Sequence, residues 1–331
     1  MRYFFHLLFI ASLYFTSVFA DAEKVSSYTL DIEFTPQQSH MQGQAAITFT
    51  GPLTSGTKTF YLHAELEVDS VSLNGKDLEF ETDQVFYDSN YALVADKVSF
   101  ELVEDIADAQ LTVTYQGYFH PSAARSPSDY MRIDDDGVFL RAWGYSLWFP
   151  VFLDDDDDVY KVDFPSVRFR IPRQYQLVFV GEKTSEQLTP EHAITTWRAD
   201  DIELWDPQVT AQEFMQLKSG KVTIYHLNDD ESRQAARSVA DFTSQLLAFY
   251  AAHYQQNAGV DRLNLLEMPK YGDISSHNMV GVSSDTFRSF DTATYAKRTI
   301  AHELVHPFVS VQVSRTNPLW SLAIEGFPSY F

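Results

Sequence analysis

The sequence predicts an α+β protein with a β-rich first half and a mixed second half. Residues from Tyr28 to Gly117 mostly alternate between apolar and polar side chains, which is typical of half-buried antiparallel strands. From about Asp230 to Asn257, apolar residues recur every three or four positions instead, which predicts an amphipathic helix. A second helix is expected from about Thr292. Because 331 residues exceed the usual size of one domain, two domains are expected.

Strand signals continue through the rest of the chain. Asn74-Gly75 separates two early segments and predicts a hairpin, because both residues tolerate positive φ. Four tryptophans lie among the strand-like segments, where they could line a ligand groove, but packing in a β core is the favoured role. They are Trp143, Trp148, Trp197 and Trp205. The later strand-like segments span residues 167–171, 175–180, 213–217, 222–225, 263–266 and 279–282.

The composition excludes several classes of function. The chain has no cysteine, which excludes disulfides, thiolate metal ligands and a cysteine nucleophile. Its formal net charge of −22 argues against nucleic acid as a partner, because phosphate binding needs clustered Lys and Arg. Asp154 to Asp158 form an acidic run that lacks the spacing of a calcium-binding loop, so a solvated acidic loop is expected there.

Residues 1–20 predict a signal peptide. Arg2 precedes an apolar run, and Val18 and Ala20 stand three and one positions before the expected cleavage site. The alternative is a membrane anchor, which needs about 20 continuous apolar residues, more than this run provides. We therefore expect a periplasmic or secreted protein with no membrane span after cleavage.

The strongest chemical signal is the motif His302-Glu303-Leu-Val-His306 in the second predicted helix. Residues four apart lie on one helical face, so the two imidazoles can bind one Zn²⁺, with Glu303 beside the position where water binds. The alternative is a surface helix whose His and Glu side chains merely pair. A third ligand is expected from a following helix, and Glu325, 19 positions after His306, is the candidate.

The HExxH motif at 302–306, eighteen intervening residues and then Glu325 resemble the aminopeptidase N family of gluzincin metallopeptidases, whose pattern is HExxH-x18-E. Trp148-Phe-Pro150 is similar to a stretch in the first half of that family. The resemblance implies an antiparallel β-saddle or sandwich domain at residues 21–219. It implies the first part of a thermolysin-like α+β catalytic domain at residues 220–331.

The resemblance also implies an activity. His302, His306 and Glu325 would bind one Zn²⁺, and Glu303 would be the general base of a zinc metallopeptidase. The expected reaction is aminopeptidase-type removal of N-terminal residues from peptide substrates. Because the family's catalytic domain extends further, we expect this chain to be a fragment or a truncated relative.

Two departures from the family pattern affect these expectations. A loop glutamate that holds the substrate's amino group in the family corresponds here to His277, followed by Asn278, and these two residues are the candidate substrate-binding pair. Imidazole holds an ammonium group poorly, so an endopeptidase or altered-specificity gluzincin is an alternative, as is a non-catalytic peptide-binding relative. Pro307, directly after His306, predicts a kink in the helix.

Overall fold

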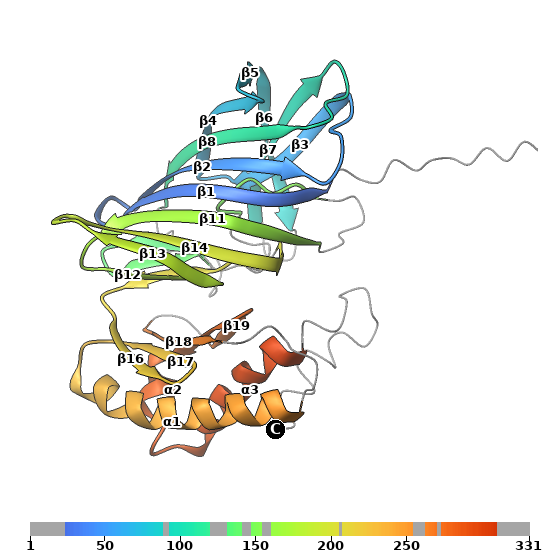
Figure 1. The fold of residues 1–331 in the computed structure, drawn as a ribbon. Coiled ribbons are helices and arrows are strands. Elements are labelled where there is room, and N and C mark those ends of the chain that lie inside the picture. The colour runs from blue at the N-terminus through green and yellow to red at the C-terminus, as the bar shows by residue number, and fades with distance from the viewer. Residues whose placement is uncertain are drawn as a thin grey trace, which may run out of the picture.

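A computed structural model gives the fold of the chain (Figure 1). The structure describes residues 24–88, 93–119, 131–140, 147–153, 160–204, 207–253, 262–269 and 273–309. The predicted signal peptide, the acidic run at 154–158, Trp143, Trp205 and Glu325 lie outside the described residues.

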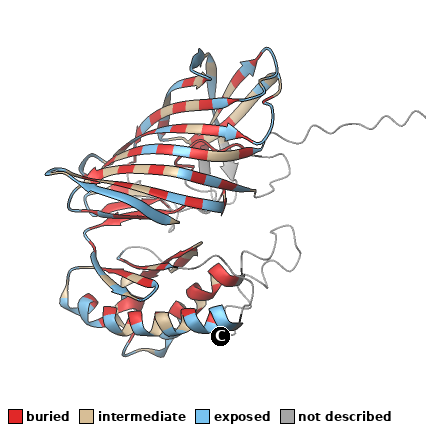
Figure 2. Cartoon of the chain, viewed as in Figure 1, coloured by how far each residue is buried: buried red, intermediate tan, exposed pale blue. Residues whose placement is uncertain are grey.

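An eight-stranded sheet dominates the first part of the chain. It contains β1 (Val25–Thr35), β2 (His40–Phe49), β4 (Leu66–Leu73), β5 (Lys76–Leu78), β8 (Gln110–Tyr118), β11 (Lys161–Pro172), β13 (Glu182–Leu188) and β14 (His192–Glu203). The order is β13-β14-β11-β1-β2-β8-β4-β5. Buried and exposed residues alternate along the long strands, which appear banded in Figure 2. One face of the sheet therefore packs in a core, as the period of two predicts.

Two smaller sheets complete this part. One contains β3 (Gly56–His63), β6 (Phe80–Asp88) and β7 (Leu93–Leu102), and the other contains β9 (Met131–Asp134), β10 (Gly137–Leu140), β12 (Gln176–Phe179) and β15 (Val209–Gln212). A short 3-10 helix, η1 (Pro36–Gln38), joins β1 to β2. We call β1 to β15 the β-rich module.

Aromatic side chains fill the core of the β-rich module. Tyr28 stacks on Phe164 with ring centroids 5.7 Å apart. Trp148 is fully buried and its Nε1 donates a hydrogen bond to the carbonyl oxygen of Pro207 at 3.2 Å. Trp197 is 2% exposed. The packing role predicted for these two tryptophans is confirmed.

The predicted hairpin at Asn74-Gly75 is also confirmed. Both residues have positive φ, 49° and 77°, and they connect the antiparallel strands β4 and β5. Asparagine and glycine adopt this left-handed conformation at low cost, so the local sequence is sufficient to specify the turn.

The second part of the chain contains a five-stranded sheet with three helices. The strands are β16 (Met215–Ser219), β17 (Val222–His226), β18 (Leu263–Met268), β19 (Ile274–Ser276) and β20 (Met279–Ser283), in the order β16-β17-β18-β20-β19. The helices are α1 (Asp230–His253), α2 (Ser284–Arg288) and α3 (Thr294–Val309). We call β16 to α3 the C-terminal module. The division of the chain at residue 219 stays a prediction, and β16 pairs with β17 across it.

In the five-stranded sheet, strands β17, β18 and β20 are buried on both faces. Ile224, Leu265 and Val280 belong to a core that includes apolar residues of α1, α2 and α3, and Figure 1 shows these helices on the side away from the β-rich module. The neighbouring residues Tyr225 and Leu266 join the core of the β-rich module instead. Successive side chains of a strand point to opposite faces, so one face of the sheet packs on the helices and the other on the β-rich module.

The two predicted helices are close to α1 and α3. Asp229 caps α1, because its Oδ1 accepts a hydrogen bond from the N–H of Ser232 at 2.9 Å. Asp230 and Glu231 follow in the first turn, where negative charge favours the helix dipole. No helix among the described residues is long and apolar enough to cross a membrane.

The predicted fold class, α+β with an antiparallel N-terminal domain and a thermolysin-like catalytic domain, is wrong. Among the described residues, strand accounts for 57% and helix for 19%, so this part of the chain is mostly β, and it contains only three α-helices. The eight-stranded sheet is also mixed, since β1 and β11 are parallel. Strand β13 is exposed at all seven residues, so its sequence does not alternate between buried and exposed positions. Strands of this kind cannot be predicted from hydrophobic periodicity, and they raise the strand content above the predicted one.

Candidate metal centre

Helix α3 carries the candidate centre on a well-packed segment. Ile300, Leu304 and Phe308, spaced by four, are buried and belong to the core of the C-terminal module. The hydroxyl of Tyr250 in α1 donates a hydrogen bond to the carbonyl oxygen of Ala301 at 3.1 Å. The Tyr250 ring also lies 5.6 Å from that of Phe308. These contacts hold α3 against α1 on both sides of the HExxH motif.

The two histidines of the motif converge as their spacing predicts. The Nε2 atoms of His302 and His306 are 3.1 Å apart, and the ring centroids are 4.8 Å apart. The Oε1 atom of Glu303 lies 4.0 Å from His302 Nε2. One ligand atom from each of the three residues lies within 4.8 Å of the others.

The geometry of the two nitrogens fits a zinc ion. Nitrogen ligands about 2.0–2.1 Å from a tetrahedral zinc lie about 3.3 Å from each other. The observed Nε2–Nε2 separation of 3.1 Å is close to that distance. A hydrogen bond that shares one proton between the rings fits the same distance, and a metal-binding measurement distinguishes the two.

The protonation state of His306 favours metal binding. Burial, with a smaller contribution from neighbouring His302, lowers the pKa of His306 to about 4. The ring is therefore neutral near pH 7, and a neutral imidazole is the form that binds metals. His306 is thus able to bind a cation without first losing a net proton.

Glu303 is the acid of the motif, and it is almost fully buried. The residue is 8% exposed, and its carboxylate lies beside the two histidines rather than in solvent. A carboxylate held there is in reach of a water molecule that binds next to the histidines, which is where a general base is needed.

Helix α3 continues through Pro307 to Val309. Proline lacks the N–H that would bond to the carbonyl oxygen of Glu303, four residues earlier. Glu325, the predicted third ligand, lies outside the described residues.

The predicted substrate-binding pair lies in the turn between β19 and β20. The side chain of Asn278 is hydrogen-bonded to Gly181 of the β-rich module, with both distances 2.9 Å. His277 adopts a left-handed φ of 43°. Burial lowers the pKa of His277, and so does the positive charge of Lys161, while Asp201 partly offsets both. Both side chains are therefore directed toward the β-rich module.

Replacing His277 with asparagine is expected to reduce the loss of stability in acid. Because its pKa is lowered in the folded protein, His277 takes up a proton in the unfolded chain first, below its ordinary pKa of about 6.5. The free energy of unfolding should therefore fall between pH 7 and pH 5, and by less in His277→Asn, since asparagine tolerates the left-handed φ. Urea unfolding of both proteins at both pH values measures the difference. An equal fall in both would contradict the expectation.

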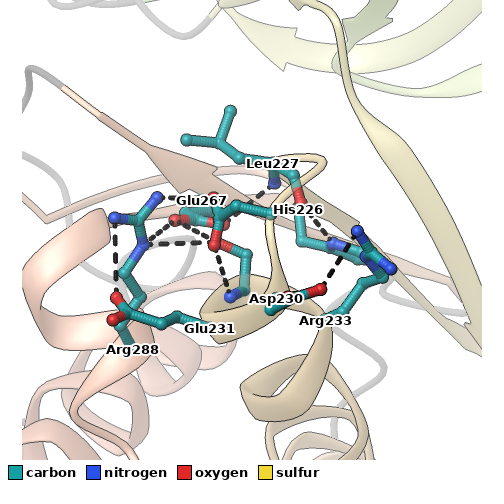
Figure 3. A network of polar contacts seen from close by, with 9 residues as sticks. His226, Leu227, Asp230, Glu231, Arg233, Glu267 and Arg288 are labelled. Carbon is teal, nitrogen blue, oxygen red and sulfur yellow. Dashed lines mark hydrogen bonds and ion pairs between the residues drawn. The ribbon is translucent and has the colours of Figure 1, made fainter.

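The sequence analysis missed a buried ionic network beside α1 (Figure 3). Glu267, at 0% exposure, accepts hydrogen bonds from Ser232 Oγ at 2.9 Å, Arg288 Nε at 3.0 Å and the N–H of Leu227 at 2.9 Å. Arg288 also donates to Asp229 at 2.8 Å. A charged residue inside the apolar strand β18 was the available signal. Every carboxylate oxygen of Glu267 is satisfied, so the network joins β18, α1 and α2.

Comparison with models of known protein families and with curated protein sequences finds no match.

Proposed function

We propose that this protein is a zinc-dependent peptide hydrolase of the gluzincin type. The observation that carries the proposal is the convergence of His302, Glu303 and His306 on one turn of α3. Two imidazole nitrogens close to the separation that zinc requires, with a carboxylate beside them, are the parts that metal-assisted hydrolysis needs. The motif resemblance to the aminopeptidase N family supports the same function.

The proposed ligands are His302, His306 and, from the sequence spacing, Glu325. When bound, zinc supplies a Lewis acid that lowers the pKa of a water molecule and polarises the peptide carbonyl. Glu303 takes a proton from the attacking water as the water oxygen bonds to the carbonyl carbon. It passes that proton to the amide nitrogen as the C–N bond breaks, so a carboxylic acid and an amine leave and Glu303 is regenerated.

Aminopeptidase activity is the first specificity we propose, on the motif resemblance. An endopeptidase is the second candidate, and the environment of the β19–β20 turn favours it. The Asn278 side chain is hydrogen-bonded to Gly181, and His277 feels the charges of Lys161 and Asp201, which form an ion pair at 2.7 Å. Neither side chain offers negative charge to a substrate's ammonium group. The predicted signal peptide of residues 1–20 would place the enzyme outside the cytoplasm.

Zinc binding should depend on both histidines. Loss of an outer contact to a metal ligand typically costs 10–100-fold in affinity, so His302→Ala and His306→Ala are each expected to weaken zinc binding by more than about 100-fold. Isothermal titration of zinc into the metal-free protein measures this, with His192→Ala, in β14, as the control. Wild-type affinity in either α3 variant would contradict the proposal.

Specificity is decided by comparing one peptide with a free and an acetylated N-terminus. An aminopeptidase should cleave only the free form, whereas equal rates would identify an endopeptidase. A full-length protein that binds zinc one to one but cleaves neither peptide would be the non-catalytic relative, and would overturn the proposed hydrolysis.

A further inference from the structure

Asn278 connects the two modules through its side chain. Its amide nitrogen donates a hydrogen bond to the carbonyl oxygen of Gly181 at 2.9 Å, and its Oδ1 accepts one from the N–H of Gly181 at 2.9 Å. Asn278 is 8% exposed. A buried amide that satisfies both backbone groups of one residue acts like an additional strand pairing, here between residues 97 positions apart.

Gly181 presents a rigid docking point. It has a φ of 95° in the turn between β12 and β13. A Cβ atom added at Gly181 would lie 2.3 Å from the carbonyl oxygen of Arg198 and 2.7 Å from the Cβ of Ala199, both in β14. The backbone of Gly181 is therefore pressed against the eight-stranded sheet, and only glycine fits there.

The turn that Asn278 holds determines where β19 lies. The carbonyl oxygen of Asn278 accepts a hydrogen bond from the N–H of Asn264 at 2.9 Å, so the turn is fixed to the C-terminal module by its backbone and to the β-rich module by its side chain. From this turn β19 runs back along β20 as the edge strand of the sheet. Helix α3 packs against both strands.

We infer that Asn278 is a positioning residue, which anchors the β19–β20 turn to Gly181 and so holds edge strand β19 in place beside the metal-binding helix α3. The strand has three residues, Ile274–Ser276, so its pairing with β20 offers few hydrogen bonds to keep it there. Through this anchor, the β-rich module helps to hold the strand that packs against α3, which carries the candidate centre. The kinetic consequence rests on the proposed function, whereas the structural consequence does not.

Hydrogen exchange of the β19 amides tests the anchor directly. Asn278→Ala is expected to speed exchange in Ile274–Ser276 by about tenfold, because opening of this strand no longer has to break two buried hydrogen bonds. Arg262→Ala is the matched control. It removes a second polar contact between the modules, to Glu182 Oε1 at 2.8 Å, but this pair is exposed (72% and 62%) and should change exchange by less than about twofold.

The variant Asn278→Asp tests whether the two hydrogen bonds to Gly181, rather than the size of the side chain, anchor the turn. At pH 8 the carboxylate of Asp at this position can accept the hydrogen bond from the Gly181 N–H. It has no proton to donate to the Gly181 carbonyl oxygen, so the second hydrogen bond is lost. At pH 5 partial protonation, favoured by burial, restores the donor. The ratio of β19 exchange in Asn278→Asp to that in the wild type should therefore fall from pH 8 to pH 5, while the same ratio for Asn278→Ala stays constant.

The kinetic test measures KM and zinc affinity separately, and only KM is expected to change. Asn278→Ala is expected to raise KM for a peptide substrate by about tenfold and to leave zinc affinity within about threefold of the wild type. If the wild type hydrolyses no peptide, the proposed function fails, and the exchange result alone decides on the anchor. Unchanged β19 exchange in Asn278→Ala, an equal effect in Arg262→Ala, or faster exchange spread evenly over both modules would each overturn the inference.

Discussion

Replacing Glu303 with glutamine is expected to lower kcat/KM for peptide hydrolysis by about 10²- to 10⁴-fold, the range that one general base contributes. Glutamine keeps the size and shape of the side chain but cannot take a proton from water. Glu303 is 8% exposed and lies beside His302 and His306, so a carboxylate dissolved in the buffer is not expected to take over its role as base. Steady-state rates on a chromogenic peptide measure the loss.

The same variant should retain its metal and its fold. His302 and His306 are unchanged, so zinc content determined by atomic absorption should remain at one ion per chain, and the circular dichroism spectrum should match the wild type. Glu213→Gln, at an exposed position of the β-rich module, controls for the loss of one negative charge. A Glu303→Gln protein that hydrolyses peptides at the wild-type rate would exclude Glu303 as the base.

Replacing Glu267 with alanine should have the largest effect on stability. The change leaves the N–H of Leu227 without its acceptor and takes away one of the two acceptors of the Ser232 hydroxyl (Figure 3). It also removes the buried partner of Arg288, whose side chain is 33% exposed and keeps its ion pair with Asp229. Breaking a buried ion pair by removing one partner costs about 3–5 kcal/mol. Urea unfolding followed by circular dichroism of the helices measures the free energy of unfolding.

Two comparisons make this second prediction specific. Arg198→Ala removes an exposed pair with Asp200, whose side chains are 61% and 54% exposed, and should leave the free energy of unfolding nearly unchanged. The double variant Glu267→Met/Arg288→Met removes both charges and should be less destabilised than Glu267→Ala, because neither member of the Glu267–Arg288 pair is left without the other. A Glu267→Ala protein within about 1 kcal/mol of the wild type would show that the network adds little to folding.

Local periodicity was enough to predict several elements of this protein. The alternation around Tyr28, the hairpin at Asn74-Gly75 and the two long helices depend on side chains close together in sequence. The convergence of His302 and His306 is of the same kind, because a helix repeats every 3.6 residues and brings positions four apart onto one face. These features need only that the local segment forms its own strand, turn or helix.

Long-range contacts determined the rest. The parallel pairing of β1 with β11, which makes the large sheet mixed, joins strands separated by most of the β-rich module. Strand β13 is exposed at every residue and polar at all but Leu188, so it forms because β14 offers its edge rather than because its own sequence is strand-like. These additional strands make the protein mostly β, where the sequence predicted α+β.

The surroundings of the candidate centre also depended on tertiary structure. The sequence by itself determined the HExxH motif and its spacing on α3. Only the fold shows that Asn278 is bonded to Gly181 and that Glu267 meets Arg288. Hydrogen bonds and buried charges require a partner at about 3 Å with the correct direction, and no local pattern of residues reveals which distant segment the folded chain brings to that distance.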